Sequence, residues 1–300
     1  MTIEPGWPVA FALAALLVLA LGAHRVGGYG LDRSVLIAAV RALVQLTLIA
    51  LVIRAVVDDL RLSAALVVVM FAVAVLTTGR RVEAAHAWVW VAVAVGAGAL
   101  PVLAIVLLSG AVPAEGIALI PIAGIIVGNA MTAHTLSGRR TFAALREENG
   151  QYEASLSLGL LPAQAVGEIV HRRSPEALLP GLDQVRTTGL VTLPGAFIGV
   201  MLGGGSPVQA ATVQVLVLFG IMAAQAITVV VAERLVEARR LLPADLRVSL
   251  VDGGRLGPSG AAAGLAGGST PSDAAARSAR LAPSAPSSSR PRSRRSALVP

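Results

Sequence analysis

Two polar residues near the start of the chain have the types and the spacing to contact a solute inside an apolar segment. Arg41 precedes Gln45 by four residues, which places both side chains on one face of a helix. A charge in such a segment is costly unless it reaches an interface or finds partners. Two interpretations stay open: a polar patch that contacts a solute, or a structural pair whose arginine reaches the interface.

A second set of candidate residues combines an amide with small residues at helical spacing. Its members lie in two later apolar runs: Asn129, Met131, Pro194, Gly195, Gly199 and Gly203. Small residues four positions apart let helices approach closely, and an amide can form a hydrogen bond across that contact. We expect packing to be their main role, with direct contact to a solute as the alternative for Asn129. Pro194 should bend or break its helix, and with Gly195 it could act as a hinge.

Residues able to bind a metal are sparse. The histidines lie near the ends of apolar runs without the spacing of metal ligands, and we expect each at the interface or surface: His24, His86, His134 and His171. Three methionines offer thioethers, although methionine in an apolar helix usually packs: Met131, Met201 and Met222. Any metal ligands therefore stay unknown at this point.

The absence of two residue types excludes several kinds of chemistry. The chain contains no cysteine, and all 24 of its Lys and Arg residues are arginine. It therefore has no thiol nucleophile, no Schiff-base lysine and no lysine for a nucleotide-binding P-loop. No intramembrane Asp or Glu is well placed, which argues against a carrier coupled to protons or sodium. We expect no cofactor on this chain; if ATP is used, ATP and Mg bind to another polypeptide.

The composition places these residues in a membrane. The chain is 55% hydrophobic and 14% charged, with a mean hydropathy of +0.77. A helix crosses a bilayer with about 20 apolar residues, and the apolar runs of suitable length are 7–23, 35–54, 62–78, 87–109, 116–136, 188–204 and 208–232. Their continuity favours helices over a β-barrel. We predict an all-α integral membrane bundle of about seven transmembrane helices, in a domain of residues 1–250.

The arginines predict an orientation for this bundle. They concentrate in alternate connections and after the last run, and such basic segments stay in the cytoplasm. This predicts a protein of the inner (plasma) membrane whose N-terminus lies outside the cell and whose C-terminus lies in the cytoplasm. Residues 251–300 change to Gly, Ala, Ser, Pro and Arg, which predicts a disordered basic tail. That tail is either a solvated extension or a contact to anionic lipid.

The long polar connection, residues 137–187, contains two predicted helices. Residues 146–157 and 163–172 favour helix, and between them Gly159 suits a helix end and Pro162 a helix start. The word "EASLSLG" (153–159) resembles the EAA-x-x-x-G signature of ABC-importer permeases, whose loop docks on an ATP-binding subunit. Ser155 departs from that signature. The alternative is an ordinary amphipathic helix at the membrane surface.

Several words taken together resemble the FetB-type permease family. They are "RALVQL" (41–46), "IPIAGIIVGNAM" (120–131), "EASLSLGLLPAQA" (153–165) and "ALLPGLDQVRTTGLVTLPGAFIGVMLGGGSPVQAATVQ" (177–214). The resemblance covers about residues 9–245. The family includes bacterial iron-export ABC permeases and the membrane halves of plant aluminium-tolerance transporters.

The resemblance implies a membrane-spanning permease subunit of an ABC transporter. It implies a homodimer that exports iron or a related metal or solute, driven by a separate ATP-binding subunit docked on residues 137–187. Its docking contact would comprise Glu153, Ala154, Gly159 and Pro162. The lipid bilayer is a further expected partner, and nucleic acid is not. Two alternatives stay open, an ion-coupled secondary carrier and a membrane scaffold that transports nothing.

Overall fold

The computed structural model describes residues 6–252, which form helices and short connections without a strand. All but the first two residues of the predicted basic tail, 251–300, lie outside the described residues. The α-helices are α1 (Trp7–Val26), α2 (Asp32–Val56), α3 (Leu60–Arg81), α4 (Trp88–Leu108), α5 (Gly116–Glu147), α6 (Asn149–Ser157), α7 (Pro162–Arg173), α8 (Leu179–Thr187), α9 (Gly195–Leu202), α10 (Pro207–Glu237) and α11 (Ala244–Arg247). Shorter turns are η1 (Ala85–Ala87), η2 (Ser174–Ala177) and η3 (Val248–Asp252).

Within the described residues, six helices are long and apolar enough to cross a membrane. They are α1, α2, α3, α4 with the preceding η1, α5 and α10. Each coincides with one of the predicted apolar runs, because a hydrocarbon core selects about 20 continuous apolar residues per helix. The all-α membrane fold is therefore confirmed.

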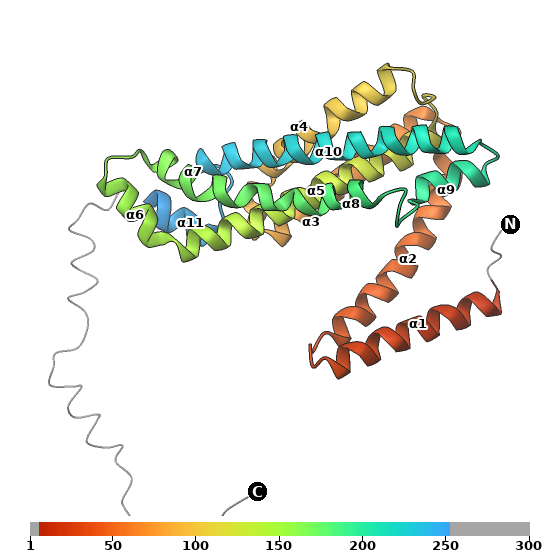
Figure 1. Ribbon diagram of the computed structural model, residues 1–300, viewed down its shortest axis with the longest axis horizontal. Coiled ribbons are helices and arrows are strands. Elements are labelled where there is room, and N and C mark those ends of the chain that lie inside the picture. The colour runs from red at the N-terminus through yellow and green to blue at the C-terminus, as the bar shows by residue number, and fades with distance from the viewer. Residues whose placement is uncertain (1–5, 253–300) are drawn as a thin grey trace, which may run out of the picture. The chain divides into compact units, whose positions relative to one another are not determined.

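Four helices, α3, α4, α5 and α10, pack into the core of this bundle (Figure 1). Helices α4 and α10 cross so closely at Gly98 of α4 that a side chain there would meet α10. A Cβ on Gly98 would lie 2.4 Å from the carbonyl oxygen of Ala224 and 2.1 Å from the hydroxyl of Thr228. Small residues at such a crossing let two helices pack by van der Waals contact. By contrast, α1 and α2 contain no buried residue.

The sixth predicted run, residues 188–204, does not form a continuous helix. Residues 188–194 are non-helical, and α9 extends for only 8 residues, which is about 12 Å. Two residues account for the break. Gly189 has a φ of 87°, in the left-handed region that favours glycine, and Pro194 lacks the N–H that a preceding helical turn would need.

The chain from α7 to α9, which includes the broken segment, runs along α10 (Figure 1). From α7 to the start of α10 the chain is antiparallel to α10, as successive neighbouring pairs show: Gly167 with Glu237, His171 with Glu233, Gly181 with Gln225, and Gly205 with Gln209. The segment α8, 188–194 and α9 thus accompanies the apolar part of α10. The predicted continuous span over residues 188–204 is therefore wrong, and a discontinuous segment occupies its place.

Candidate coupling surface and intramembrane polar sites

The connection between α6 and α7, residues 158–161, has the predicted helix-glycine-proline-helix form, and we call it the elbow. Gly159 has a φ of 90°, and its N–H donates to the carbonyl of Leu156 at 3.0 Å, as at a glycine-terminated helix end. Pro162 is the first residue of α7. The predicted helix 146–157 is split, however, because Arg146 continues α5 and the backbone departs from helical geometry at Glu148.

The elbow exposes apolar side chains beside a polar helix face. Leu158 is 82% exposed and Leu161 65% exposed. Glu153 and Ala154 are also exposed, and the Glu153 carboxylate accepts a hydrogen bond from Asn149 at 3.1 Å. The elbow belongs to the charged end of the molecule. Its two exposed leucines are a candidate contact for a partner or for the membrane surface.

The helices on both sides of the elbow are firmly anchored. One face of α7 is buried: Ala165, Val166, Ile169 and Val170. This face packs against α5 and α10. The α6 helix is held by Tyr152, whose hydroxyl donates to the carbonyl of Leu250 at 3.3 Å. Arg172 and Arg173 each donate to the Glu148 carboxylate at 3.0 Å. A force on the elbow would therefore reach both long helices.

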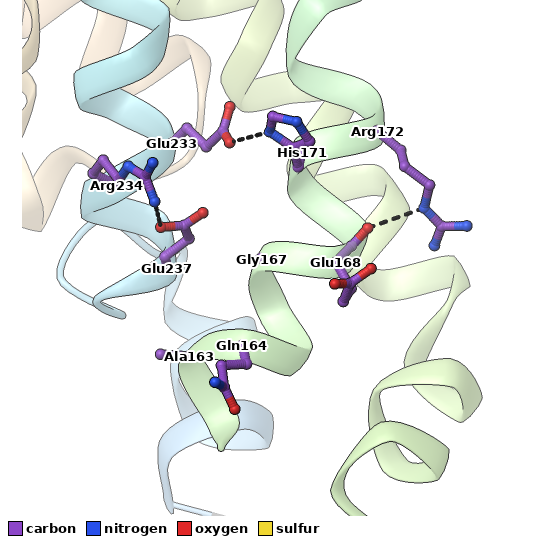
Figure 2. A pocket seen from close by; sticks show the side chains of 9 residues that line it. All are labelled: Ala163, Gln164, Gly167, Glu168, His171, Arg172, Glu233, Arg234 and Glu237. Atoms are coloured by element: carbon purple, nitrogen blue, oxygen red, sulfur yellow. Dashed lines mark hydrogen bonds and ion pairs between the residues drawn. The ribbon is translucent and has the colours of Figure 1, made fainter. Parts of the chain in front are cut away.

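A groove between α7 and α10 contains His171, which was predicted from the sequence only as an interface or surface residue. Its lining comprises Ala163, Gln164, Gly167, Glu168, His171, Arg172, Glu233, Arg234 and Glu237 (Figure 2). Nδ1 of His171 lies 2.8 Å from Oε1 of Glu233. This hydrogen bond, followed by the charge of Glu233, raises the pKa of His171. The pair was missed because its members are 62 positions apart.

A second cluster of ion pairs joins α5 to neighbouring segments. The Arg146 guanidinium contacts Asp245 of α11 at 2.7 Å and Glu83, in the connection after α3, at 2.9 Å. The hydrogen bond from Arg146 lowers the pKa of Asp245. Both pairs are partly solvated, so each adds little to the free energy of folding and mainly fixes the position of the segments that it joins. Together they hold the charged end of α5 in place beside the elbow.

Arg41 and Gln45 lie on one exposed face of α2, as their spacing predicts. They line a shallow apolar groove with Leu36, Ile37, Val40 and Val44. Among the described residues neither side chain has a hydrogen-bond partner. The structure therefore brings the two together but joins them to no other candidate residue.

Asn129 forms a polar junction between α5 and α10. Its amide donates to the Ile125 carbonyl at 2.9 Å and accepts from Nε2 of Gln225 at 3.3 Å. The Gln225 amide in turn abuts α8, since a Cβ on Gly181 would lie 2.0 Å from its Oε1. Met131 packs against the hydrophobic core. The interhelical hydrogen bond was expected, but Gln225 was missed because one amide in an apolar run gives no sign of its partner.

The glycine stripe of α9 makes less contact than expected. A Cβ on Gly195 or Gly199 would meet no atom within 4 Å, and one on Gly203 would meet only the carbonyl oxygens of its own preceding turn. The expected close packing of these glycines therefore does not occur within the described chain. Pro194 caps the start of α9, so its expected break is present.

One expectation about the histidines is wrong. His134 is fully buried, and neither of its ring nitrogens has a hydrogen-bond partner. The apolar run ends near this residue, but α5 continues to Glu147 within the bundle and so encloses it. Across residues 6–252, no three His, Cys, Asp or Glu residues are grouped as a metal site would require.

Comparison with known proteins shows that the chain is similar to other membrane proteins. Residues 8–241 match the family described as "Uncharacterised protein family (UPF0014)". The probable iron export permease protein FetB of Escherichia coli is 32% identical over 75% of this chain and 87% of its own length. The UPF0014 membrane protein STAR2 of rice is 30% identical over 72% and 77%. ALUMINUM SENSITIVE 3 of Arabidopsis thaliana is 39% identical over 33% and 37%. No solved structure matches the chain.

Proposed function

Because this chain belongs to the UPF0014 family of multi-pass membrane proteins, we propose that it is the membrane subunit of an ABC exporter. The similarity to FetB, whose name describes a probable iron export permease, carries this proposal. The exposed leucines of the elbow support it, because they form an apolar patch outside the spans that a separate ATP-binding subunit can cover.

In this proposal two copies of the chain form the pathway, and two ATP-binding subunits engage the two elbows. ATP and Mg bind to those subunits, since this chain has no lysine for a P-loop. Closure of the ATP-binding pair would move each elbow, and α7 would pass the movement to α5 and α10. The spans then change access because the partner has different affinities for the two states.

The proposed cargo is iron or a related metal or solute, moved out across the plasma membrane. The name of FetB supports iron. The proposed orientation has the N-terminus outside and the elbow in the cytoplasm, where ATP is available. The arginine-rich connections support this orientation.

Reconstitution tests the proposal directly. The tagged full chain is coexpressed with ATP-binding subunits encoded in the same genome, purified, and placed in vesicles with iron on the side of the elbow, offered either as iron(II) ion or as a neutral iron(III) complex. One subunit should copurify, and iron should cross only when ATP and both proteins are present. Transport by this chain alone, driven by an ion gradient, would contradict the proposal. Failure of every ATP-binding subunit to copurify would also contradict it.

A further inference from the structure

A cavity of about 280 Å³ lies beside the non-helical residues 188–194. It lies between residues 188–194, the start of α9 and the first half of α10, and it is partly open. The lining is mainly apolar and includes Leu193, Phe197, Leu218 and Phe219. Its polar members include Thr188 and Gln214, and no charged residue belongs to it.

The cavity lies at membrane depth. The apolar stretch of α10 comprises residues 208–232, and Gln214 is 7 residues after Pro207, or roughly 10 Å along the helix axis. Irregular backbone at such a depth is tolerated only where it is enclosed by protein or lines a cavity. On one side the non-helical segment lines this cavity, between the end of α8 and the start of α9.

Gln214 has an unused capacity for hydrogen bonds. It is 5% exposed, and its Oε1 has no hydrogen-bond partner. Thr188 has a related capacity, because its hydroxyl donates to the Gln184 carbonyl at 2.7 Å and keeps its lone pairs. A buried amide without a partner is unfavourable, so its retention beside a cavity points to a ligand that completes it.

We propose that this cavity binds the cargo, and that the cargo enters as an uncharged species with an apolar body and at least one N–H or O–H donor. The donor would bond to Oε1 of Gln214. A bare metal ion is disfavoured, because the lining offers neutral oxygen atoms and apolar side chains, which cannot replace its hydration. A metal would therefore pass as a complex whose ligands cover its charge. Calling the ligand a cargo rests on the proposed function. The cavity and the chemistry of its lining do not depend on that function.

Ligand binding to the full chain alone, in lipid nanodiscs, tests this site. Three probes are compared by thermal unfolding: iron(II) ion, the neutral iron(III) tris(acetohydroxamate) complex, and acetohydroxamic acid without metal. Both neutral probes carry an apolar methyl group and N–H donors. Stabilisation by the complex alone would identify a masked metal, and stabilisation by the free acid as well would identify organic solutes. Stabilisation by iron(II) ion only, or by no probe, would overturn the proposal.

Two glutamines on the same helix give the matched comparison. Gln214→Leu should leave the ligand-free chain as stable as before, since it removes an unpaired amide, but should raise the half-saturating probe concentration about tenfold. Gln225→Leu should lower the stability of the ligand-free chain and leave that concentration unchanged. Ala211→Phe, which fills the cavity, should abolish binding. Equal binding by the wild type and Gln214→Leu would overturn the assignment.

This experiment is independent of the ATP-binding subunit. Probe binding that persists when no ATP-binding subunit copurifies would contradict the proposed function and leave the site intact. ATP-dependent transport without any effect of Gln214→Leu on binding or transport would contradict the site alone.

Discussion

His171 and Glu233 connect α7 to the charged end of α10 through a 2.8 Å contact between Nδ1 and a carboxylate oxygen. The contact links the helix after the elbow to a membrane-spanning helix. Since the imidazole is exposed and the carboxylate largely enclosed, the proton on His171 is open to the surrounding pH.

We expect this connection to weaken as the pH rises. A histidine whose pKa is raised in the folded state contributes stability fully below its unfolded pKa, about 6.5, and loses it as the pH rises through the higher folded value. The titration of His171, followed by NMR, should shift to lower pH in Glu233→Gln. Glu237→Gln is the control, because Glu237 acts on His171 only through space, and it should shift the titration less. An unchanged titration in Glu233→Gln would disprove the role of this pair.

The left-handed backbone at Gly159 predicts a position-specific cost. Gly159→Ala should destabilise the elbow by about 1 kcal/mol and reduce stimulation of the ATP-binding subunit. Gly150→Ala is the matched control: a Cβ meets no atom within 4 Å at either glycine, but Gly150 lies in a helix and has no positive φ. Limited proteolysis at the elbow and ATPase assays measure both effects. Equal behaviour of the two variants would show that the turn geometry is unimportant.

Replacing the exposed leucines of the elbow should weaken binding of the partner without lowering the stability of the chain. The double change Leu158→Ser and Leu161→Ser should leave the unfolding temperature nearly unchanged, because both side chains are exposed. It should weaken binding of the ATP-binding subunit by about tenfold or more, given the apolar area lost. Val248→Ser alters another exposed apolar residue outside the spans and should retain binding. Normal affinity in the double variant would place the docking surface elsewhere.

The crossing of α4 and α10 predicts different tolerance at two neighbouring glycines. Gly98→Ala should lower the free energy of unfolding by about 1–3 kcal/mol, because its Cβ would be 2.4 Å from the backbone oxygen of Ala224. Gly96→Ala should be tolerated, since its nearest contact is the Phe71 ring at 3.4 Å. Thermal unfolding in nanodiscs compares them, and equal stability would mean that the two helices separate easily.

The membrane fold was largely predictable from the sequence, and so was a break at Pro194, but the length of the non-helical segment was not. Six spans follow from apolar length, and the elbow follows from the conformational preferences of Gly159 and Pro162. Residues 188–204 are as apolar as a continuous transmembrane helix, because an apolar environment selects apolar side chains whether or not the backbone is helical. Pro194 indicates one end of the interruption, but Gly189 alone does not indicate the other, so the non-helical length of residues 188–194 became visible only in the structure.

The candidate sites were predictable only where residues close in sequence act together. Arg41 and Gln45 share a helix face, as their spacing of four requires. The partners of Asn129 and His171 lie on α10, 96 and 62 positions away, and their pairing depends on helix register. His134 was misplaced because the end of an apolar run need not be the end of the protein interior.

One consequence follows from the uninterrupted length of α5. Its 32 residues span about 48 Å, and the helix extends from the far end of the bundle to the ion pairs of Arg146, with Pro121 near its start as its internal proline. A rotation of about 10° at one end would displace the other by about 8 Å. Small angular changes where the nucleotide-driven partner is proposed to bind would thus become displacements as large as a solute molecule on the opposite side of the bilayer.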